Sequence, residues 1–261
     1  MNHLKFEELG VSMSGQRFGV VLETGPDTAG RDEFLALMHE MEKDPCHVQH
    51  VAGLALQLFD GLALLHGLGE RERLLLEAAA CLHDIGHRTE APGQEHHKES
   101  ARHIRGREWR HFSPREVELF AQVARYHRKS LPQLRHEPFD ALSPEDRSRV
   151  QQLAALLRLA DGLDRRHAQL VTRLSAELAP DRIVFHLHTT EIASREIIAA
   201  TQKADLAEAV FGRKVEFKAK LAPGRLGVGA EAGNHADSER PTPAAAPAPT
   251  LEPAAHRLPS K

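Results

Sequence analysis

Residues 74 to 86 read LLLEAAACLHDIG, an apolar run that leads directly into His83 and Asp84. The run predicts a buried helix over about residues 70–85, and Gly86 gives it a suitable C-terminal stop. An imidazole and a carboxylate at the inner end of a buried helix are costly unless something pairs with them. A metal ion is the simplest partner, because neutral imidazole and carboxylate are both good metal ligands.

Other polar side chains occur where apolar helical faces run out. His47 lies one helical turn before Val51, the first residue of a face that repeats at helical spacing to Leu62. A lone histidine of this kind is usually a hydrogen-bonded core or surface residue, but several helices that present His or Asp inward form a bundle metal site. The set as a whole favours metal, and its candidate ligands are His47, His83, Asp84, His97, His127 and Asp161.

Two helix starts are encoded plainly. Ser113 followed by Pro114 and Glu116 forms a capping sequence, and Ser143-Pro144 repeats the device. The first predicted helix runs toward His127 and the second toward Asp161. Both helices therefore carry a candidate ligand near their C-terminal end.

The hydrophobic period changes after Arg166. Residues 170–178 and 183–187 read as two strands around a turn, 191–211 as a helix ended by Gly212, and 215–217 as a third strand. A short strand-like piece occurs at 18–22, and the Ala/Pro-rich sequence beyond Pro223 is expected to be disordered. The predicted fold is mainly α, and its four parts are an N-terminal segment 1–30, a helical bundle 31–168, a small α+β subdomain 169–220 and a disordered tail 221–261.

The composition excludes several classes of protein. The chain has 261 residues and a net charge of −3, so it has no basic footprint for nucleic acid. No stretch approaches a membrane span, and the N-terminus does not read as a signal peptide. With only two cysteines, Cys46 and Cys81, a disulfide framework is not expected and the cytoplasm is the predicted compartment. Eighteen histidines are unusual and fit metal or proton chemistry.

The sequence resembles the HD superfamily of metal-dependent phosphohydrolases. It is most similar to the HD-like C-terminal region of the exopolyphosphatase / guanosine pentaphosphate phosphatase family, from about residue 31 to 220. The strings that carry the resemblance are VAGLALQLFD at 51–60, AACLHDIG at 79–86, HHKES at 96–100, ARYHRK at 124–129 and LLRLADGLDR at 156–165. The segment SMSGQRFGV at 12–20 resembles the last stretch of the actin-like catalytic domain that precedes this region in the family, although the chain has no room for that domain.

The resemblance implies an HD-type helical bundle and a set of ligands. His47, His83, Asp84 and Asp161 match the four ligands of the minimal HD motif, and His97 and His127 match the extra ligands of two-metal members. Whether His96 or His97 points inward is open. Asp164 is expected either to support the site as a neighbouring carboxylate or to pair with Arg165. The family also implies a homodimer.

The donor set suits a divalent transition metal, with Mn, Fe, Co, Ni or Zn favoured over Mg and with one or two ions. Asp84 would bridge two ions, since it offers two oxygens at the centre of the set. His87 occupies a place where several HD enzymes have a phosphate-contacting lysine, and with Asp84 and Lys98 it is a candidate catalytic residue. The cations expected to bind substrate phosphate are Arg125, Arg128, Lys129, Arg158 and Arg165.

Three functions follow from these observations. The first is hydrolysis of a phosphate ester or anhydride, with a nucleotide, an alarmone or polyphosphate as substrate. The second is a non-catalytic module that binds polyphosphate or an alarmone in the same pocket. The third is a dimeric scaffold whose metal is structural. Retention of all the ligand positions favours the first.

Overall fold

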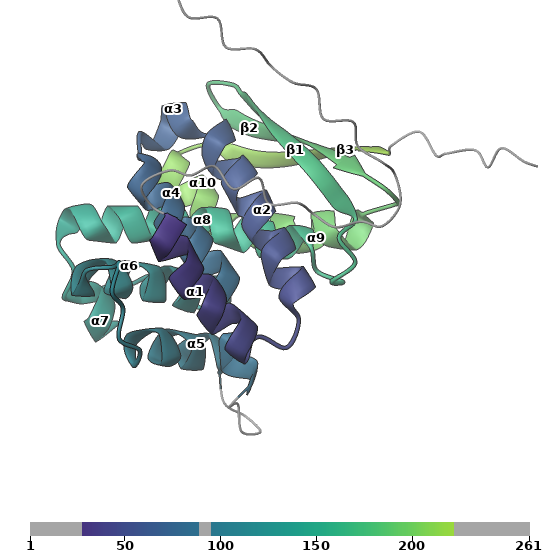
Figure 1. Cartoon of the computed structure of the whole chain (residues 1–261). Coiled ribbons are helices and arrows are strands. Elements are labelled where there is room, and N and C mark those ends of the chain that lie inside the picture. The colour runs from purple at the N-terminus through teal and green to yellow at the C-terminus, as the bar shows by residue number, and fades with distance from the viewer. Residues whose placement is uncertain (1–27, 89–94, 222–261) are drawn as a thin grey trace, which may run out of the picture. The chain divides into compact units, whose positions relative to one another are not determined.

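The computed structural model describes residues 28–88 and 95–221. Within these ranges the protein is mainly helical, with one small three-stranded sheet, as predicted (Figure 1). The strand-like piece at 18–22, the segment 12–20, nearly all of the N-terminal segment and the tail beyond residue 221 lie outside the described residues. No helix in the described part of the chain is long and apolar enough to cross a membrane.

The described residues form ten α-helices, one 3-10 turn and three strands. In chain order they are α1 Thr28–Met41, α2 Pro45–Gly61, α3 Ala63–His66, α4 Glu70–Leu82, the 3-10 turn η1 Ile85–Arg88, α5 His96–Arg105, α6 Pro114–Arg125, α7 Glu137–Asp140, α8 Pro144–Leu163, β1 Val171–Leu178, β2 Arg182–Thr189, α9 Ser194–Gln202, α10 Asp205–Phe211 and β3 Lys214–Leu221.

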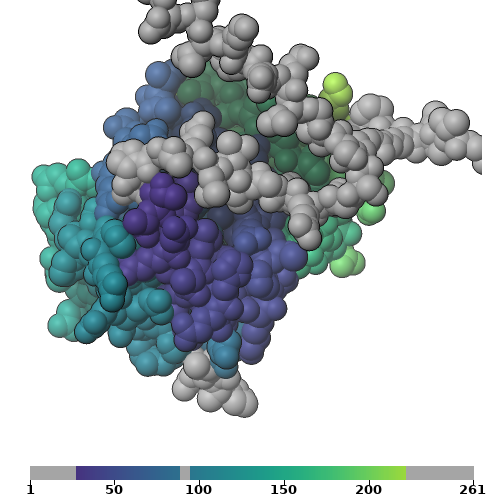
Figure 2. Space-filling view, viewed as in Figure 1, coloured from purple at the N-terminus to yellow at the C-terminus, as the bar shows by residue number. Residues whose placement is uncertain are grey.

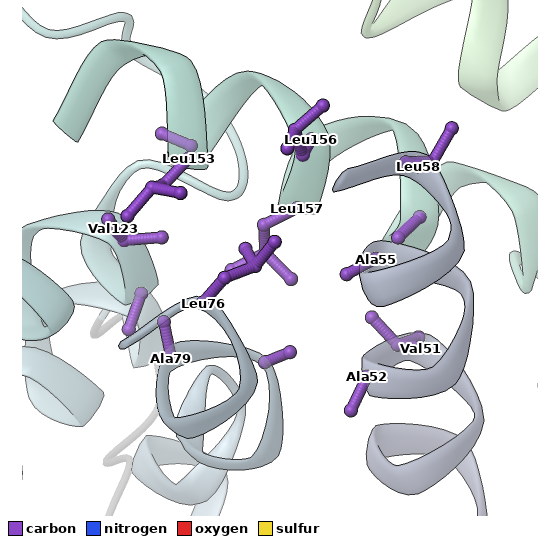
Figure 3. Close-up of a cluster of buried hydrophobic side chains, with 14 of the residues drawn as sticks. Val51, Ala52, Ala55, Leu58, Leu76, Ala79, Val123, Leu153, Leu156 and Leu157 are labelled. Atoms are coloured by element: carbon purple, nitrogen blue, oxygen red, sulfur yellow. The ribbon is translucent and has the colours of Figure 1, made fainter. Parts of the chain in front are cut away.

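The core of the bundle lies between α2, α4, α6 and α8. Figure 3 shows Val51 and Ala55 of α2 facing Leu76 of α4 and Leu157 of α8, and all four side chains are fully buried. Each buried Val or Leu contributes roughly 1.5–3 kcal/mol relative to exposure. Helix α1 packs on α4 and forms part of the outer surface on the face shown in Figure 2.

The helix starts use the predicted caps. The Ser113 side chain accepts a hydrogen bond from the backbone N–H of Glu116, and Ser143 does the same for Asp146. Helix α2 begins similarly, because Asp44 accepts from the N–H of His47. These caps fix where each bundle helix starts, and so fix His47 on the first turn of α2.

The sheet confirms the predicted strands and adds their order. Strands β1 and β2 form an antiparallel hairpin, and β3 pairs parallel to β2 after the crossover through α9 and α10. The single helix predicted over 191–211 is instead two helices, with a break at Lys203 and Ala204. Gly212 ends the second helix with a positive φ of 63°, as predicted.

Helix α9 packs closely on α8 at one point. A Cβ on Gly162 of α8 would lie 2.6 Å from the Cα of Ala200 in α9, so only glycine permits this approach. Strand β1 likewise packs on α2, and the buried apolar cluster includes residues on both sides of the predicted boundary at 168/169. The close packing brings α9 next to the C-terminal end of α8.

Gly86 has a different role from the predicted helix stop. Helix α4 already ends at Leu82, and Gly86 lies in η1, where an added Cβ would meet the carbonyl oxygen of His96 at 2.1 Å and the backbone nitrogen of Ser100 at 2.6 Å. The Ser100 hydroxyl accepts from the Gly86 N–H and donates to the carbonyl of His83. Gly86 therefore allows α5 to pack against the chain that carries His83 and Asp84.

Candidate metal centre

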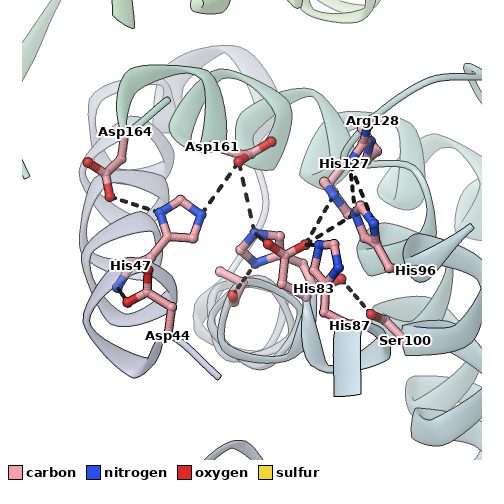
Figure 4. A network of polar contacts seen from close by, with 12 residues as sticks. Asp44, His47, His83, His87, His96, Ser100, His127, Arg128, Asp161 and Asp164 are labelled. Atoms are coloured by element: carbon pink, nitrogen blue, oxygen red, sulfur yellow. Dashed lines mark hydrogen bonds and ion pairs between the residues drawn. The ribbon is translucent and has the colours of Figure 1, made fainter. Parts of the chain in front are cut away.

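Five of the predicted ligands meet inside the bundle, and Figure 4 labels His47, His83, His127 and Asp161 among them. His47 comes from the first turn of α2, His83 and Asp84 follow α4, His127 follows α6, and Asp161 lies near the end of α8. The three imidazoles are buried, with at most 1% of each residue exposed. Segments distant in sequence thus present nitrogen and oxygen donors to one interior space.

Each imidazole forms a hydrogen bond through its Nδ1 atom, on the side of the ring away from the interior space. The Nδ1 of His47 lies 2.8 Å from the Asp164 carboxylate. The Nδ1 atoms of His83 and His127 each lie 2.7 Å from the backbone carbonyl three residues earlier. A carbonyl only accepts, so Nδ1 carries a proton in His83 and His127, and Nε2 is the ring nitrogen that faces the interior. Buried metal-ligating histidines are oriented in this way.

The inward atoms face carboxylate oxygens across gaps too long for hydrogen bonds. His47 Nε2 lies 3.7 Å from Asp161 Oδ1, His83 Nε2 lies 3.7 Å from Asp84 Oδ2, and His127 Nε2 lies 3.6 Å from Asp84 Oδ1. Among the described residues, His47 Nε2, His83 Nε2 and Asp84 Oδ1 are buried with no hydrogen-bond partner. Two ligands that each lie ~2 Å from a shared ion are separated by such distances, so the residues fit a metal ion.

A second group of donors shares Asp84. Its atoms come from Asp84, His87 and His96, while the first group comprises His47, His83 and Asp84. His96 Nε2 lies 3.4 Å from Asp84 Oδ1, and the His87 ring stacks on His96 with 3.7 Å between centroids. Asp84 is thus common to both candidate groups.

His96 and His97 point to different sides of α5. Only His96 belongs to a candidate metal group among the described residues, although the family pattern assigned the position to His97. The His97 ring lines a neighbouring cavity, and its centroid lies 6.3 Å from that of His127. Burial lowers the pKa of His97 to about 4. The orientation of adjacent residues at a helix start depends on packing, which the sequence did not specify.

Neighbouring charges shift the pKa values of His47 and Asp84 in opposite directions. Burial lowers the pKa of His47, but Asp161 and Asp164 outweigh burial and raise it to about 9. Burial raises the pKa of Asp84, whereas His83 and His127 lower it, with a net value of about 2. Asp84 is therefore ionised at neutral pH, and His47 carries a proton unless a cation replaces it.

His127 and Asp161 are also displaced from their usual ranges. Burial and the neighbouring His83 hold the pKa of His127 well below its usual value, so the ring is neutral and able to act as a ligand. Burial opposes ionisation of Asp161, but Lys203 and His47 keep its pKa well below the usual range. The cluster thus combines a neutral imidazole with ionised carboxylates.

Sequence reasoning missed three supporting residues. His167 stacks flat on His47, with 3.6 Å between ring centroids, and its Nδ1 lies 2.8 Å from Asp44. The φ of His167 is +55°, a strained value for a residue with a side chain. Lys203, at the end of α9, forms an ion pair with Asp161 Oδ2. The Asp44-Pro45 capping sequence was a readable signal for Asp44, but no sequence signal marks His167 or Lys203.

Asp164 takes the first of its two expected roles. Its carboxylate is only 1% exposed and accepts from His47 and from the backbone N–H of Gln169. Arg165 is exposed at the same helix end. Asp164 therefore supports a candidate ligand, and no ion pair joins it to Arg165.

The predicted substrate cations are placed very differently from one another. Arg128 is at the cluster, with Nη1 3.0 Å from His96 Nε2. Lys129 pairs with Glu95, and so does Lys98, which was predicted to be a catalytic residue. Arg158 is buried and contacts the carbonyl of Tyr126 and the carboxylate of Asp205, away from the candidate ligands. Arg125 lies over the ring of Tyr126, 5.4 Å from its centroid.

Buried imidazoles and carboxylates from several helix ends define a class, the helical proteins with an interior His/Asp metal-type site. Residues 33–200 match the family model described as Ppx/GppA phosphatase, domain III. The match covers more than half of the chain, so the protein belongs to the Ppx/GppA phosphatase family, and the predicted relation to its C-terminal region is confirmed. No match was found among curated proteins.

Proposed function

We propose that the protein is a metal-dependent phosphohydrolase of the HD type that cleaves a phosphate ester or anhydride. The observation that carries the proposal is the buried, unpartnered Nε2 of His47 and of His83, each facing a carboxylate across 3.7 Å. Such atoms cost free energy unless a cation binds them. Membership of a phosphatase family supports phosphate as the reacting group.

The residues that would hold metal are His47, His83, Asp84 and Asp161, with His96 and His127 as ligands of a second ion. When bound, a divalent ion acidifies water and offsets charge on the phosphoryl oxygens. Asp84 belongs to both groups of donors and would supply one carboxylate oxygen to each. Asp164 and His167 would hold His47 in position, and the carbonyls of Ala80 and Ala124 would fix the other two rings.

Cations beside the ligands support an anionic substrate. Arg128 lies against His96, and Lys203 lies against Asp161. Both can turn toward a phosphate once a cation occupies the ligands, and the planar guanidinium matches phosphate oxygens well. His87 is 40% exposed at the edge of the cluster, where it can donate a proton to a leaving oxygen. A nucleotide, an alarmone or polyphosphate would satisfy this arrangement.

The test measures metal content and phosphate release together. We expect purified protein to retain a transition metal and, with added Mn²⁺, to release phosphate from generic esters, nucleotides or polyphosphate. His83→Ala and Asp84→Ala should abolish both metal binding and turnover while helix content is preserved. His186→Gln, which alters an exposed histidine paired with Glu177, should leave both unchanged.

Two results would separate the competing functions. Metal binding with no turnover of any substrate, but with retained polyphosphate binding, would favour the non-catalytic module. Absence of metal binding in the wild type would reject both, because neither the hydrolase nor a metallated receptor could then exist.

A further inference from the structure

A small cavity of about 130 Å³ lies behind the candidate metal centre. Its walls come from the start of α5, the end of α6 and the loop that precedes α7. The residues that line it are His97, Lys98, Arg125, Tyr126, Ser130 and His136. All six carry polar groups, so the cavity is suited to a small polar ligand and unsuited to an apolar one.

The cavity has an excess of positive charge. Arg125 is half-buried over Tyr126, and no carboxylate of the described residues forms an ion pair with it. Lys98 pairs with Glu95, but that carboxylate is shared with Lys129. Burial, Arg125 and Arg135 all lower the pKa of His136, in keeping with a cationic surrounding. A half-buried guanidinium without a carboxylate is a ready partner for an anion.

The hydrogen-bond donors around the cavity suit an oxyanion. The Tyr126 hydroxyl is held 2.9 Å from His136 Nδ1. The His97 Nδ1 is buried and has no hydrogen-bond partner among the described residues. Arg125, Lys98 and Ser130 add N–H and O–H donors. None of the six lining side chains is a carboxylate, so the cavity wall offers no negative charge to a cation.

The cavity and the metal centre share a wall. His96 and His127 face the cluster around Asp84, while their neighbours His97 and Tyr126 line the cavity. The ring centroids of His96 and His97 are 5.8 Å apart. One layer of side chains therefore separates the two sites.

We propose that this cavity is a second binding site, which takes a phosphate group. The preference for an oxyanion rests on the charges and donors of the cavity itself, and the choice of phosphate rests on the proposed function. The group is either a free phosphate ion or the distal phosphate of a longer phosphorylated substrate. Arg125 is its main ligand, and Lys98 and Ser130 complete the site.

The single tyrosine of the chain makes the site directly observable. Tyr126 is the only tyrosine, so ¹³C-labelled tyrosine gives one set of ring resonances in an NMR spectrum, from the cavity alone. We expect sodium phosphate to shift these resonances saturably in protein stripped of metal, and sodium chloride at equal ionic strength to leave them unchanged. Equal shifts with chloride, or no shift with phosphate, would overturn the proposal.

Matched arginine variants test the assigned ligand. Arg125→Gln should weaken phosphate binding by roughly ten- to a hundredfold, the effect of losing a charge-assisted hydrogen bond, and Arg125→Lys should restore part of it. Arg173→Gln removes the same charge from an exposed residue of strand β1, outside the cavity, and should change binding by less than about threefold. Equal effects of the two glutamine variants would overturn the assignment.

Adding Zn²⁺ and tripolyphosphate distinguishes a site for a free phosphate ion from a site for the distal phosphate of a longer substrate. A site for free phosphate binds orthophosphate equally with and without Zn²⁺. A site for a distal phosphate binds tripolyphosphate more tightly with Zn²⁺, and His83→Ala removes that gain. If His83→Ala abolishes turnover but orthophosphate still shifts the Tyr126 resonances, the second site exists independently of the metal centre. If the variant is folded and orthophosphate no longer shifts these resonances, that independence is overturned.

Discussion

The carboxylate of Asp164 accepts a hydrogen bond from Nδ1 of His47 at 2.8 Å, although the two residues are 117 positions apart in the chain. Both side chains are only 1% exposed. The contact orients the imidazole so that Nε2 faces Asp161, on the opposite side of the ring. The end of α8 therefore contributes a candidate ligand and also the group that positions another one.

Replacing Asp164 tests this positioning. Asp164→Asn keeps the shape but removes the charge, and we expect metal affinity to fall by roughly 10- to 100-fold, measured by competition with a chromogenic chelator. Asp60→Asn makes the same change near the C-terminal end of α2, at a carboxylate that pairs with Arg73 of α4. This variant should bind metal with unchanged affinity. Unchanged affinity in Asp164→Asn would show that the contact does not support the site.

The pH dependence of metal binding follows from His47. The two carboxylates raise its pKa from 6.5 to about 9 in the metal-free protein, so its charge stabilises the fold fully below pH 6.5 and less as pH rises through 9. A metal ligand must lose that proton. Affinity should therefore rise with pH between 6.5 and 9, by about tenfold per unit for one displaced proton.

Calorimetry checks the displaced proton. Titrating metal at pH 7.5 in buffers of different ionisation enthalpy gives the number of protons released, and we expect about one from His47. A metal affinity that is flat from pH 6.5 to 9 would contradict this prediction.

The choice between His96 and His97 is tested by paired alanine variants. His96→Ala removes the imidazole beside Asp84 and should lower the bound metal or weaken a second ion. His97→Ala removes a ring that lines the cavity behind the centre and should preserve metal stoichiometry. Elemental analysis of both proteins decides the matter, and a greater metal loss from His97→Ala would restore the assignment made from the family pattern.

Lys203 should oppose metal binding while favouring phosphate. Its ammonium pairs with Asp161, and a unit positive charge roughly 5 Å from a divalent cation costs up to about 7 kcal/mol at an effective dielectric of 20, and much less after screening. We expect Lys203→Met to tighten metal binding several-fold and to slow phosphate release, with Lys203→Arg intermediate. Lys220→Met on β3, an exposed lysine, serves as the control. Weaker metal binding in Lys203→Met would show that the ion pair is needed to position Asp161.

Alanine substitutions at two glycines, Gly86 and Gly53, should change the free energy of unfolding in opposite directions. The Cβ of Gly86→Ala would meet the His96 carbonyl, and the required shift should lower the free energy of unfolding by about 1–3 kcal/mol or more. Gly53→Ala, inside α2, meets nothing within 4 Å and should raise it by about 0.5–1 kcal/mol. Urea unfolding monitored by circular dichroism compares the two. Equal stabilities would contradict the close approach of α5.

Many of the helices and strands could be predicted from the sequence because they depend on interactions between residues close together in the chain. The Ser113 and Ser143 caps, the apolar face of α2 and the hairpin residues each act over a few positions. The break at Lys203 was missed because the sequence 191–211 contains no proline or glycine that would mark the end of a helix. The close contact at Gly86 was likewise mistaken for a helix stop.

The sequence by itself determined the helical fold, the small sheet and the kinds of donor atom, since periodicity, capping and residue chemistry are local properties. Only the tertiary structure decided which donors meet. It turned His96 toward Asp84 and His97 away, placed Asp164 and His167 against His47, and brought Lys203 to Asp161. These relations depend on helix rotation and on contacts between segments far apart in the chain, and such contacts leave no periodic trace in the sequence.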